Sequence, residues 1–262
     1  MWDSLDKYTD EFLHCGLLDA VDFEQFSRIA IVHHSSAIEG STLTLEESAM
    51  LITEGITAKG KSMSEHFMVT DHYKALLFCL EEAKKKTSVT PELLKQINAL
   101  VNKNNGQQRK TPLGICDDTK GDFRLGNVTA GTTYFVNDDK VVQMTNDLCK
   151  KIQDKISAVK TNREIYPLSF DTHYYLVSIH PWFDGNGRTS RLLMNYIQAW
   201  HNQPLSMVFT EDKPAYIKAL NDTRAKEDSS VFSTFMCEQQ IKYLKQEIEK
   251  YKQRNKGISF LF

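Results

Sequence analysis

The sequence predicts an all-α protein that carries one small β-hairpin. Helical periodicity dominates the 262 residues, and no internal repeat interrupts it. Two capping boxes, Thr44-x-x-Glu47 and Ser62-x-x-Glu65, open helices, and Thr90-Pro91 pairs a cap residue with a proline at the first helical position. One short stretch has β-branched and aromatic residues around a glycine turn, and it predicts the hairpin.

Residues 24–39 form an early helical element with a clear pattern. Its apolar positions share one face: Phe26, Ile29, Ala30 and His33. Gly40 is suited to the residue just after the end of such a helix, because glycine adopts a left-handed backbone without steric cost.

The middle and the end of the chain predict a helix, a long loop, the hairpin and further helices. The helix that opens at Thr90 is expected to end at Asn104-Asn105-Gly106, and the polar, turn-rich residues 107–122 are expected to form a long loop. The hairpin is expected over about 123–136, with Thr129-Ala130-Gly131 at its turn. Helices are then expected over residues 139–158, 167–180, 187–202, 213–225 and 229–253. The closing residues, 257–262, are expected to pack on the domain as a strand or plug.

Composition and charge exclude several function classes. The net charge is −2, so no basic field favours nucleic acid. Apolar runs are too short to span a membrane, and the start Met1-Trp2-Asp3-Ser4 does not resemble a signal peptide. The five cysteines are widely spaced and contain no CxxC pair, which indicates reduced thiols in a cytoplasmic protein.

The run over residues 180–191, His-Pro-Trp-Phe-Asp-Gly-Asn-Gly-Arg-Thr-Ser-Arg, is the most informative segment. It lies between two apolar helical patterns, so we expect a tight loop that enters a helix and points backbone N–H groups at an anion. Gly185 and Gly187 allow close backbone approach to a ligand. Asn186 either presents its amide there or tolerates a left-handed backbone in the same turn.

Side chains of the same run add charge and a base. Arg188 and Arg191 are three residues apart on the helix, so both guanidinium groups can reach one polyphosphate. Asp184 suits Mg²⁺, which often takes one carboxylate together with phosphate oxygens and waters. His180 ends the preceding helix and can accept a proton from an attacking hydroxyl group. Each residue type is ordinary by itself, but their combination in one loop indicates a phosphate site.

This run closely resembles the signature H-P-F-x-D/E-G-N-G-R-x-x-R of the Fic (filamentation induced by cAMP) family, with Trp182 where the family usually has Phe. The resemblance implies a Fic-type helical domain with a β-hairpin flap, and transfer of AMP from Mg-ATP to a protein hydroxyl group. It assigns these roles: His180 as the base, Asp184 on Mg²⁺, Asn186, Gly187 and Arg188 on the α- and β-phosphates, and Arg191 on the γ-phosphate.

Two further segments resemble the family. Tyr216-Ile217-Lys218-Ala219-Leu220 is similar to its Tyr-x-x-Ala-Leu segment, whose Tyr lines the nucleotide base; stacking on the base and plain core packing both stay open for Tyr216. Arg224 stands where some members have an Asn that contacts adenine.

The hairpin lies where the family has its flap. The resemblance implies that Val128, Thr129, Ala130 and Gly131 dock an extended segment of a target protein and hold a Ser, Thr or Tyr hydroxyl group beside His180. A hairpin that only covers the core is the alternative, because Gly-Asp-Phe-Arg matches the family's Gly-x-Tyr-Arg loosely.

Ser35 and Glu39 are four residues apart and share a helical face. With Gly40 they are similar to the inhibitory signature Ser/Thr-x-x-x-Glu-Gly/Asn of one class of the family. The resemblance implies that Glu39 takes the place of the γ-phosphate on Arg191. A solvated glutamate near a helix end is the ordinary alternative.

We therefore expect an N-terminal helical extension over 1–89, with the inhibitory helix at about 24–40, and a Fic catalytic core over 90–262. The expected function is a protein adenylyltransferase that uses ATP and Mg²⁺ on a protein docked at the flap, with no nucleic acid or membrane partner. Self-association stays open. Two alternatives remain: another phosphate-group transfer or AMP removal at the same site, and a non-enzymatic nucleotide sensor. Gly187 counts against a kinase, since members that phosphorylate carry Lys there.

Overall fold

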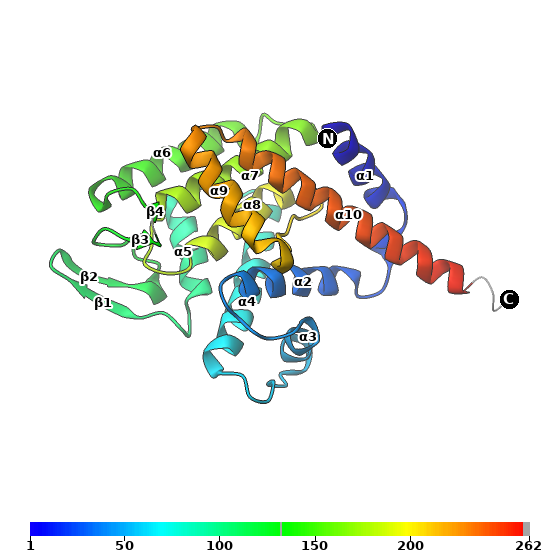
Figure 1. The fold of residues 1–262 in the computed structure, drawn as a ribbon, viewed down its shortest axis with the longest axis horizontal. Helices are drawn as coiled ribbons and strands as arrows, with labels where there is room; N and C mark the ends of the chain where they lie inside the picture. The colour runs from blue at the N-terminus through cyan, green and yellow to red at the C-terminus, as the bar shows by residue number, and fades with distance from the viewer. Residues whose placement is uncertain (132, 259–262) are drawn as a thin grey trace.

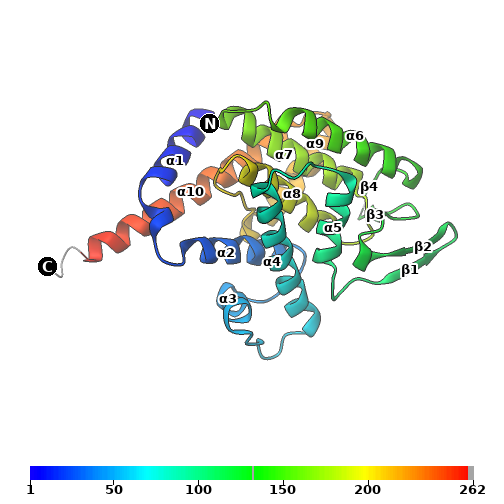
Figure 2. The same ribbon diagram turned by 180° about the vertical axis from the view of Figure 1, so that it is seen from behind.

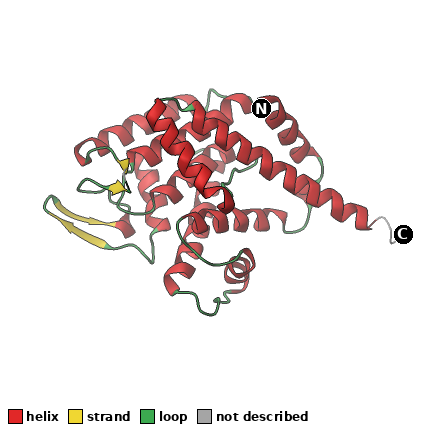
Figure 3. Ribbon diagram, viewed as in Figure 1, coloured by secondary structure: helices red, strands yellow, loops and turns green. Residues whose placement is uncertain are grey.

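Helices fill most of the structure, which confirms the predicted all-α class (Figures 1 and 3). The structure is a computed structural model that describes all residues except 132 and 259–262. The helices are α1 (Trp2–His14), α2 (Phe23–Ile38), α3 (Leu45–Glu54), α4 (Met63–Lys84), α5 (Pro91–Val101), α6 (Asp138–Ile156), α7 (Asn162–Ile179), α8 (Asn186–Trp200), α9 (Lys213–Lys226) and α10 (Ser230–Ile258). The described residues also form the short 3₁₀ turns η1 (Leu17–Asp19), η2 (Asp118–Lys120) and η3 (Thr210–Asp212).

Helix α8 forms the centre of the core because it is buried on almost every side. Its fully buried apolar residues include Leu192, Leu193, Met194, Tyr196 and Ile197. Helices α7 and α4 pack along α8, and α5 and α2 also contact it; Figure 2 shows α4 and α5 next to α8 from behind. Helix α10 packs on α1, α7 and α9 (Figure 1). The loop that leads into α8 is therefore held from several directions.

Helix starts follow the cap signals closely. The capping boxes at Thr44 and Ser62 are both formed, and Thr90 caps α5. Helix α7 begins at Asn162, earlier than the expected residue 167, because Glu164 accepts hydrogen bonds from the backbone and hydroxyl group of Thr161. Pro167 thus lies inside α7 and does not mark its start.

Two hairpins are formed where the sequence predicts one, and both lie at the end of the molecule opposite the C-terminal end of α10 (Figure 1). The predicted hairpin is short: β3 (Thr129–Ala130) pairs antiparallel with β4 (Thr133–Tyr134). The expectation of an irregular loop over 107–122 is wrong, because β1 (Gln108–Thr111) and β2 (Gly114–Asp117) form a second hairpin. These strands, Gln-Arg-Lys-Thr and Gly-Ile-Cys-Asp, lack the alternation of apolar and polar residues that marks a half-buried strand.

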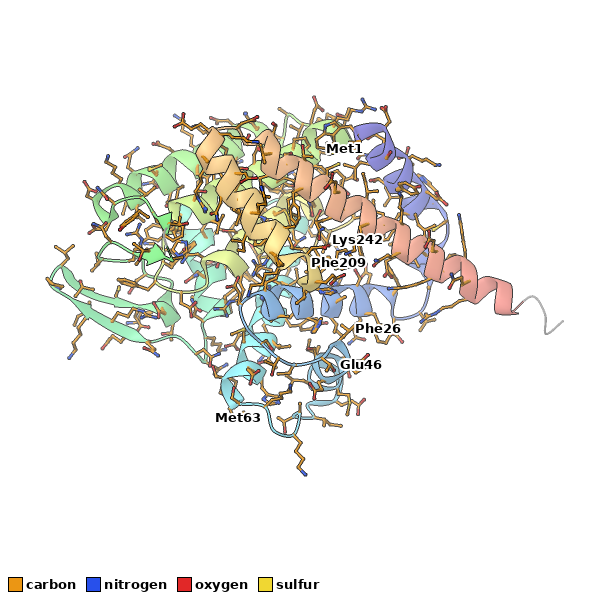
Figure 4. The ribbon with its side chains drawn as sticks, in the orientation of Figure 1. Met1, Phe26, Glu46, Met63, Phe209 and Lys242 are labelled. Carbon is orange, nitrogen blue, oxygen red and sulfur yellow. The ribbon has the colours of Figure 1, made fainter. Side chains whose placement is uncertain are left out.

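Three other expectations need correction or lie outside the described residues. Phe26 is 59% exposed on α2, so it does not share the buried face of Ile29 (Figure 4). Helix α5 ends at Val101, before the asparagines that are expected to stop it. Helix α10 continues through Ile258, and the rest of the expected closing strand or plug lies outside the described residues.

The expected division at residue 89 stays a prediction. Helices α2 and α4 of the N-terminal part share one hydrophobic core with α7 and α8. Near that core, Lys242 of α10 lies 4.3 Å above the ring of Phe209 (Figure 4).

No described helix combines the length and apolar character needed to cross a bilayer.

Candidate active site

The loop between α7 and α8 has the predicted form of a tight turn that enters a helix. His180 ends α7 in a left-handed conformation (φ 55°, ψ 60°), and Gly185 caps α8 with φ 80°. A side chain at position 185 would meet the amide groups of Asn98 and Asn102 at 2.8 Å, so only glycine fits. The N-terminus of α8 therefore points free backbone N–H groups into the space beside the loop, as an anion site requires.

Asn186 braces the loop with its side chain. Its Oδ1 accepts from the backbone N–H of Trp182 at 3.0 Å, and its Nδ2 donates to the carbonyl oxygen of Trp182 at 2.8 Å. The indole N–H of buried Trp182 donates to the carbonyl oxygen of Gly121 at 3.0 Å. Both ends of the side-chain amide group of Asn186 are thus engaged within the loop, so the group of this residue that can bind a phosphate is its backbone N–H.

Two asparagines of α5 support the same loop, and the sequence analysis missed both. Asn98 donates to the carbonyl oxygen of Asp184 at 3.1 Å and to the hydroxyl group of Thr189 at 3.1 Å. Asn102 donates to the same Asp184 carbonyl oxygen at 3.2 Å, and its Oδ1 accepts from Arg188 at 3.4 Å. The only sequence signal was their spacing of four residues, which places both amides on one helical face.

His180 lies under an aromatic cover that comes from the flap. The ring of Phe135 stacks on the imidazole with centroids 3.7 Å apart and an interplanar angle of 17°. Burial lowers the pKa of His180 to about 4, and the positive charges of Arg124 and Arg224 act in the same direction. Nδ1 lies 3.3 Å from the carbonyl oxygen of Val177; an Nδ1–H that donates there leaves Nε2 as the lone-pair nitrogen. His180 is thus held neutral, as a proton acceptor must be.

Asp184 is 47% exposed in its side chain, so a cation in solvent can reach it. Its Oδ1 accepts from the N–H of Gly185 at 2.6 Å and forms an ion pair with Arg188 at 3.2 Å. No cluster of three potential ligands occurs among the described residues. A single, accessible carboxylate fits Mg²⁺ that arrives with a nucleotide, because such a cation keeps phosphate oxygens and waters as its other ligands.

Arg191 is buried and contacts the predicted inhibitory residues of α2. Its Nε donates to the hydroxyl group of Ser35 at 2.7 Å, and its Nη2 donates to the carbonyl oxygen of Ser35 at 3.0 Å and to Oε1 of Glu39 at 2.6 Å. Gly187 allows this approach, since a Cβ there would collide with Oε1 of Glu39. The structure thus brings Ser35, Glu39, Gly187 and Arg191 together.

The Glu39–Arg191 pair is a charge-assisted contact between a buried guanidinium group and a partly exposed carboxylate. The side chain of Arg191 is 4% exposed and that of Glu39 is 33% exposed. Burial opposes ionisation of Glu39, but the charge and hydrogen bond of Arg191 outweigh it and lower the pKa of the carboxyl group. Both groups therefore stay charged at neutral pH, and the guanidinium group is occupied.

The remaining predicted residues lie on two sides of this centre. Tyr216 is buried, and its hydroxyl group lies 2.9 Å from Nε2 of His173 and 3.5 Å from Nη1 of Arg191, which is the core-packing arrangement. Contact of Tyr216 with the base of a bound nucleotide stays a prediction. The flap residues Thr129, Ala130 and Gly131 are exposed, and Val128 is partly buried.

The structure thus defines an α-helical domain whose central loop combines a neutral histidine, an accessible carboxylate, a helix N-terminus suited to an anion and buried arginines, which together fit a phosphate-binding site. Residues 88–198 match the model of the Fic/DOC family and belong to that family. Among curated proteins, the "Protein adenylyltransferase Fic" of Nematostella vectensis is 31% identical over 196 residues, which is 72% of this chain and 42% of the relative. "Protein adenylyltransferase fic-1" of Caenorhabditis elegans is 28% identical over 193 residues, which is 72% of this chain and 35% of the relative. The chain thus spans less than half the length of these relatives.

Solved structures show the same fold. A Fic domain containing signaling protein from Bacteroides thetaiotaomicron superposes with a TM-score of 0.78 at 19% identity, covering 95% of this chain and 98% of that one. A fragment of C. elegans Fic-1 superposes with a TM-score of 0.78 at 23% identity, covering 96% of this chain and 72% of that one.

Proposed function

We propose that this chain is a protein adenylyltransferase that transfers AMP from ATP to a side-chain hydroxyl group of a target protein. The observation that carries the proposal is the neutral His180 beside the N-terminus of α8, with Arg188, Arg191 and the accessible Asp184 around the same space. The names of the curated relatives support the same chemistry.

In the proposed reaction, Nε2 of His180 accepts the proton of the target hydroxyl group while the oxygen atom of that hydroxyl group attacks the α-phosphorus of ATP. The new O–P bond replaces the bond to the β-phosphate oxygen, so pyrophosphate leaves. Asp184 would hold Mg²⁺, which would neutralise phosphate charge. The backbone N–H groups at the start of α8 and the two arginines orient the phosphates, so catalysis rests on positioning and on charge stabilisation.

The proposal includes an inhibited resting state. Glu39 occupies the guanidinium group of Arg191 and lies against Gly187, in the space that a γ-phosphate would need. A carboxylate there repels a phosphate and removes its clamp, so ATP would bind weakly or with a misplaced α-phosphate.

The exposed flap supports docking of an extended target segment, because β3 and β4 pair with no third strand among the described residues and so leave their outer edges for main-chain pairing. The five free cysteines support a cytoplasmic setting for this activity.

Mass spectrometry of a cell lysate tests the proposal. The Glu39→Gly variant is incubated with Mg²⁺ and ATP, and tryptic peptides are searched for AMP on Ser, Thr or Tyr. The matched control is Glu39→Gly combined with His180→Ala, which should lose the signal because removal of a general base costs about 10²–10⁴ in rate.

Parallel reactions with ATP labelled at the α- or the γ-phosphate separate AMP transfer from phosphorylation. Label from the α-phosphate alone is expected on protein. Label only from the γ-phosphate, or equal signal with and without His180, would refute the proposal.

A further inference from the structure

Arg124 joins three segments of backbone through one buried guanidinium group. Its Nε donates to the carbonyl oxygen of His180 at 2.8 Å, and its Nη1 donates to that of Gly126 at 2.6 Å. Its Nη2 donates to the carbonyl oxygen of Val136. The backbone N–H of Arg124 also donates to the carbonyl oxygen of Pro181 at 2.9 Å. Gly126 and Val136 lie just before and just after the flap strands, so both ends of the flap share this side chain.

The guanidinium group of Arg124 binds backbone carbonyl groups and not carboxylates. Arg124 is 2% exposed, and among the described residues it forms no ion pair with a carboxylate within 4.0 Å. Its contacts go instead to carbonyl oxygens from three directions, which the planar, multi-donor fork of arginine can satisfy and a lysine ammonium group cannot.

His180, whose carbonyl oxygen accepts the hydrogen bond from Nε of Arg124, has an unfavourable backbone conformation. His180 has φ 55° and ψ 60°, a left-handed region that residues with a Cβ rarely adopt. Such a conformation persists only when its surroundings hold it. The bond from Arg124 fixes the peptide plane at His180, and with it the direction in which the imidazole leaves the backbone.

We propose that Arg124 is a positioning residue that sets the distance between the flap and the proton-accepting imidazole of His180. The same clamp holds Phe135 over the imidazole, because Phe135 directly precedes Val136. A target segment paired with the flap would thereby be placed relative to His180 without touching Arg124. The consequence for reaction rate rests on the proposed function, whereas the mechanical coupling of flap and loop does not.

Hydrogen exchange measured by mass spectrometry tests the coupling in the full chain. Arg124→Met removes all three donors at similar length, and Arg124→Lys keeps the charge but can satisfy fewer carbonyl groups. The control is Arg163→Met, which removes a half-exposed arginine that pairs with Asp3 and Asp6. Peptides covering 125–137 should exchange about 10-fold faster in Arg124→Met and less so in Arg124→Lys, with peptides of α8 unchanged. Unchanged exchange of the flap in Arg124→Met would overturn the clamp.

Side-chain ¹⁵N spectra of the unmodified protein give a second test that needs no variant. The clamp requires a protected Nε–H and Nη groups that rotate slowly, whereas a fast-exchanging, averaged guanidinium signal for Arg124 would overturn it. If the variants do not fold, this measurement by itself decides whether Arg124 couples the flap to the loop before α8.

Kinetics in the Glu39→Gly background test the link to catalysis. Arg124→Met should lower kcat for AMP transfer about 10²-fold and leave KM for ATP within about threefold, because the base is misplaced while the phosphate contacts remain. An equal effect on both parameters would overturn the positioning role in catalysis. If the Glu39→Gly protein transfers no AMP at all, the proposed function fails, and the exchange experiment still decides whether Arg124 couples the flap to the loop.

Discussion

Nη2 of Arg191 donates to Oε1 of Glu39 at 2.6 Å, across 152 positions of sequence. The contact joins the C-terminal end of α2 to the first turns of α8, where the phosphate site lies. Ser35 adds two bonds to the same guanidinium group, so Arg191 has little capacity left for a phosphate. This relationship supports an inhibited resting state.

Removal of the Glu39 carboxylate should release Arg191. We expect Glu39→Gly to raise the rate of AMP incorporation by about 10–10² fold, because misplacement of reacting groups by about 1 Å can cost 10²-fold. The combination with Arg191→Ala should lose most of that gain. Glu24→Gly is the control, since Glu24 lies exposed on the same helix and, in the described part of the chain, its ion pair is with Arg28. A Glu39→Gly protein no more active than the unmodified one would rule out the inhibitory role.

The pH dependence of transfer should reflect the neutral imidazole of His180. With a pKa of about 4 in the folded protein, His180 stays a proton acceptor through neutral pH, and the rate should fall only as the pH approaches 4. The ordinary pKa of histidine is 6.5, so between about pH 6.5 and pH 4 the unfolded chain binds this proton more readily than the folded protein does. The contribution of His180 to the free energy of unfolding should therefore be constant above about pH 6.5 and decrease as the pH falls towards 4.

Removal of the aromatic cover should move this titration. Phe135→Ala exposes the imidazole, so we expect the pKa of His180 to rise towards its ordinary value and the acidic limb of the rate profile to move to higher pH. NMR titration of the His180 ring protons measures the shift directly. Tyr134→Ala is the neighbouring control, because Tyr134 is 84% exposed. Equal titration of His180 in both variants would contradict the role of the stack.

Asp184 should carry the dependence on magnesium. Asp184→Asn keeps the size of the side chain and removes its charge, so Mg²⁺ should no longer strengthen ATP binding in calorimetry of the Glu39→Gly background. A chelator should have the same effect on the protein that retains Asp184. Asp139→Asn on the exposed face of α6 is the control. Binding and transfer that do not respond to chelator would remove the metal from the proposal.

Asn98 should contribute to stability through the active-site loop. Asn98→Ala leaves the hydroxyl group of Thr189 and the Asp184 carbonyl oxygen with fewer partners, so we expect a loss of about 1–3 kcal/mol in the free energy of unfolding. Denaturant titration measures it. Gln96→Ala, at an exposed position of the same helix, should change stability by less than about 0.5 kcal/mol. Equal effects of the two changes would show that the Asn98 bonds do not hold the loop.

The sequence by itself determined the features that depend on neighbours along the chain. The capping boxes at Thr44 and Ser62, the turn into α8 and the hairpin near Gly131 each follow from a few consecutive residues, and each is formed. The pairing of Ser35 and Glu39 on one face was also predictable, because four residues make about one helical turn.

Only the tertiary structure decided which distant residues complete the site. The polar strands of β1 and β2 carried no periodic signal. The spacing of Asn98 and Asn102 and the loose match of Gly-Asp-Phe-Arg at Arg124 do not indicate which residues they contact, and no sequence pattern marks Phe135 as the ring that stacks on His180. Their roles depend on how α5 and the flap pack against the loop before α8, and Arg124 meets His180 across 56 positions of sequence. Such contacts follow from the packing of whole helices, whose relative placement is set by the sum of many buried apolar contacts and not by any local motif.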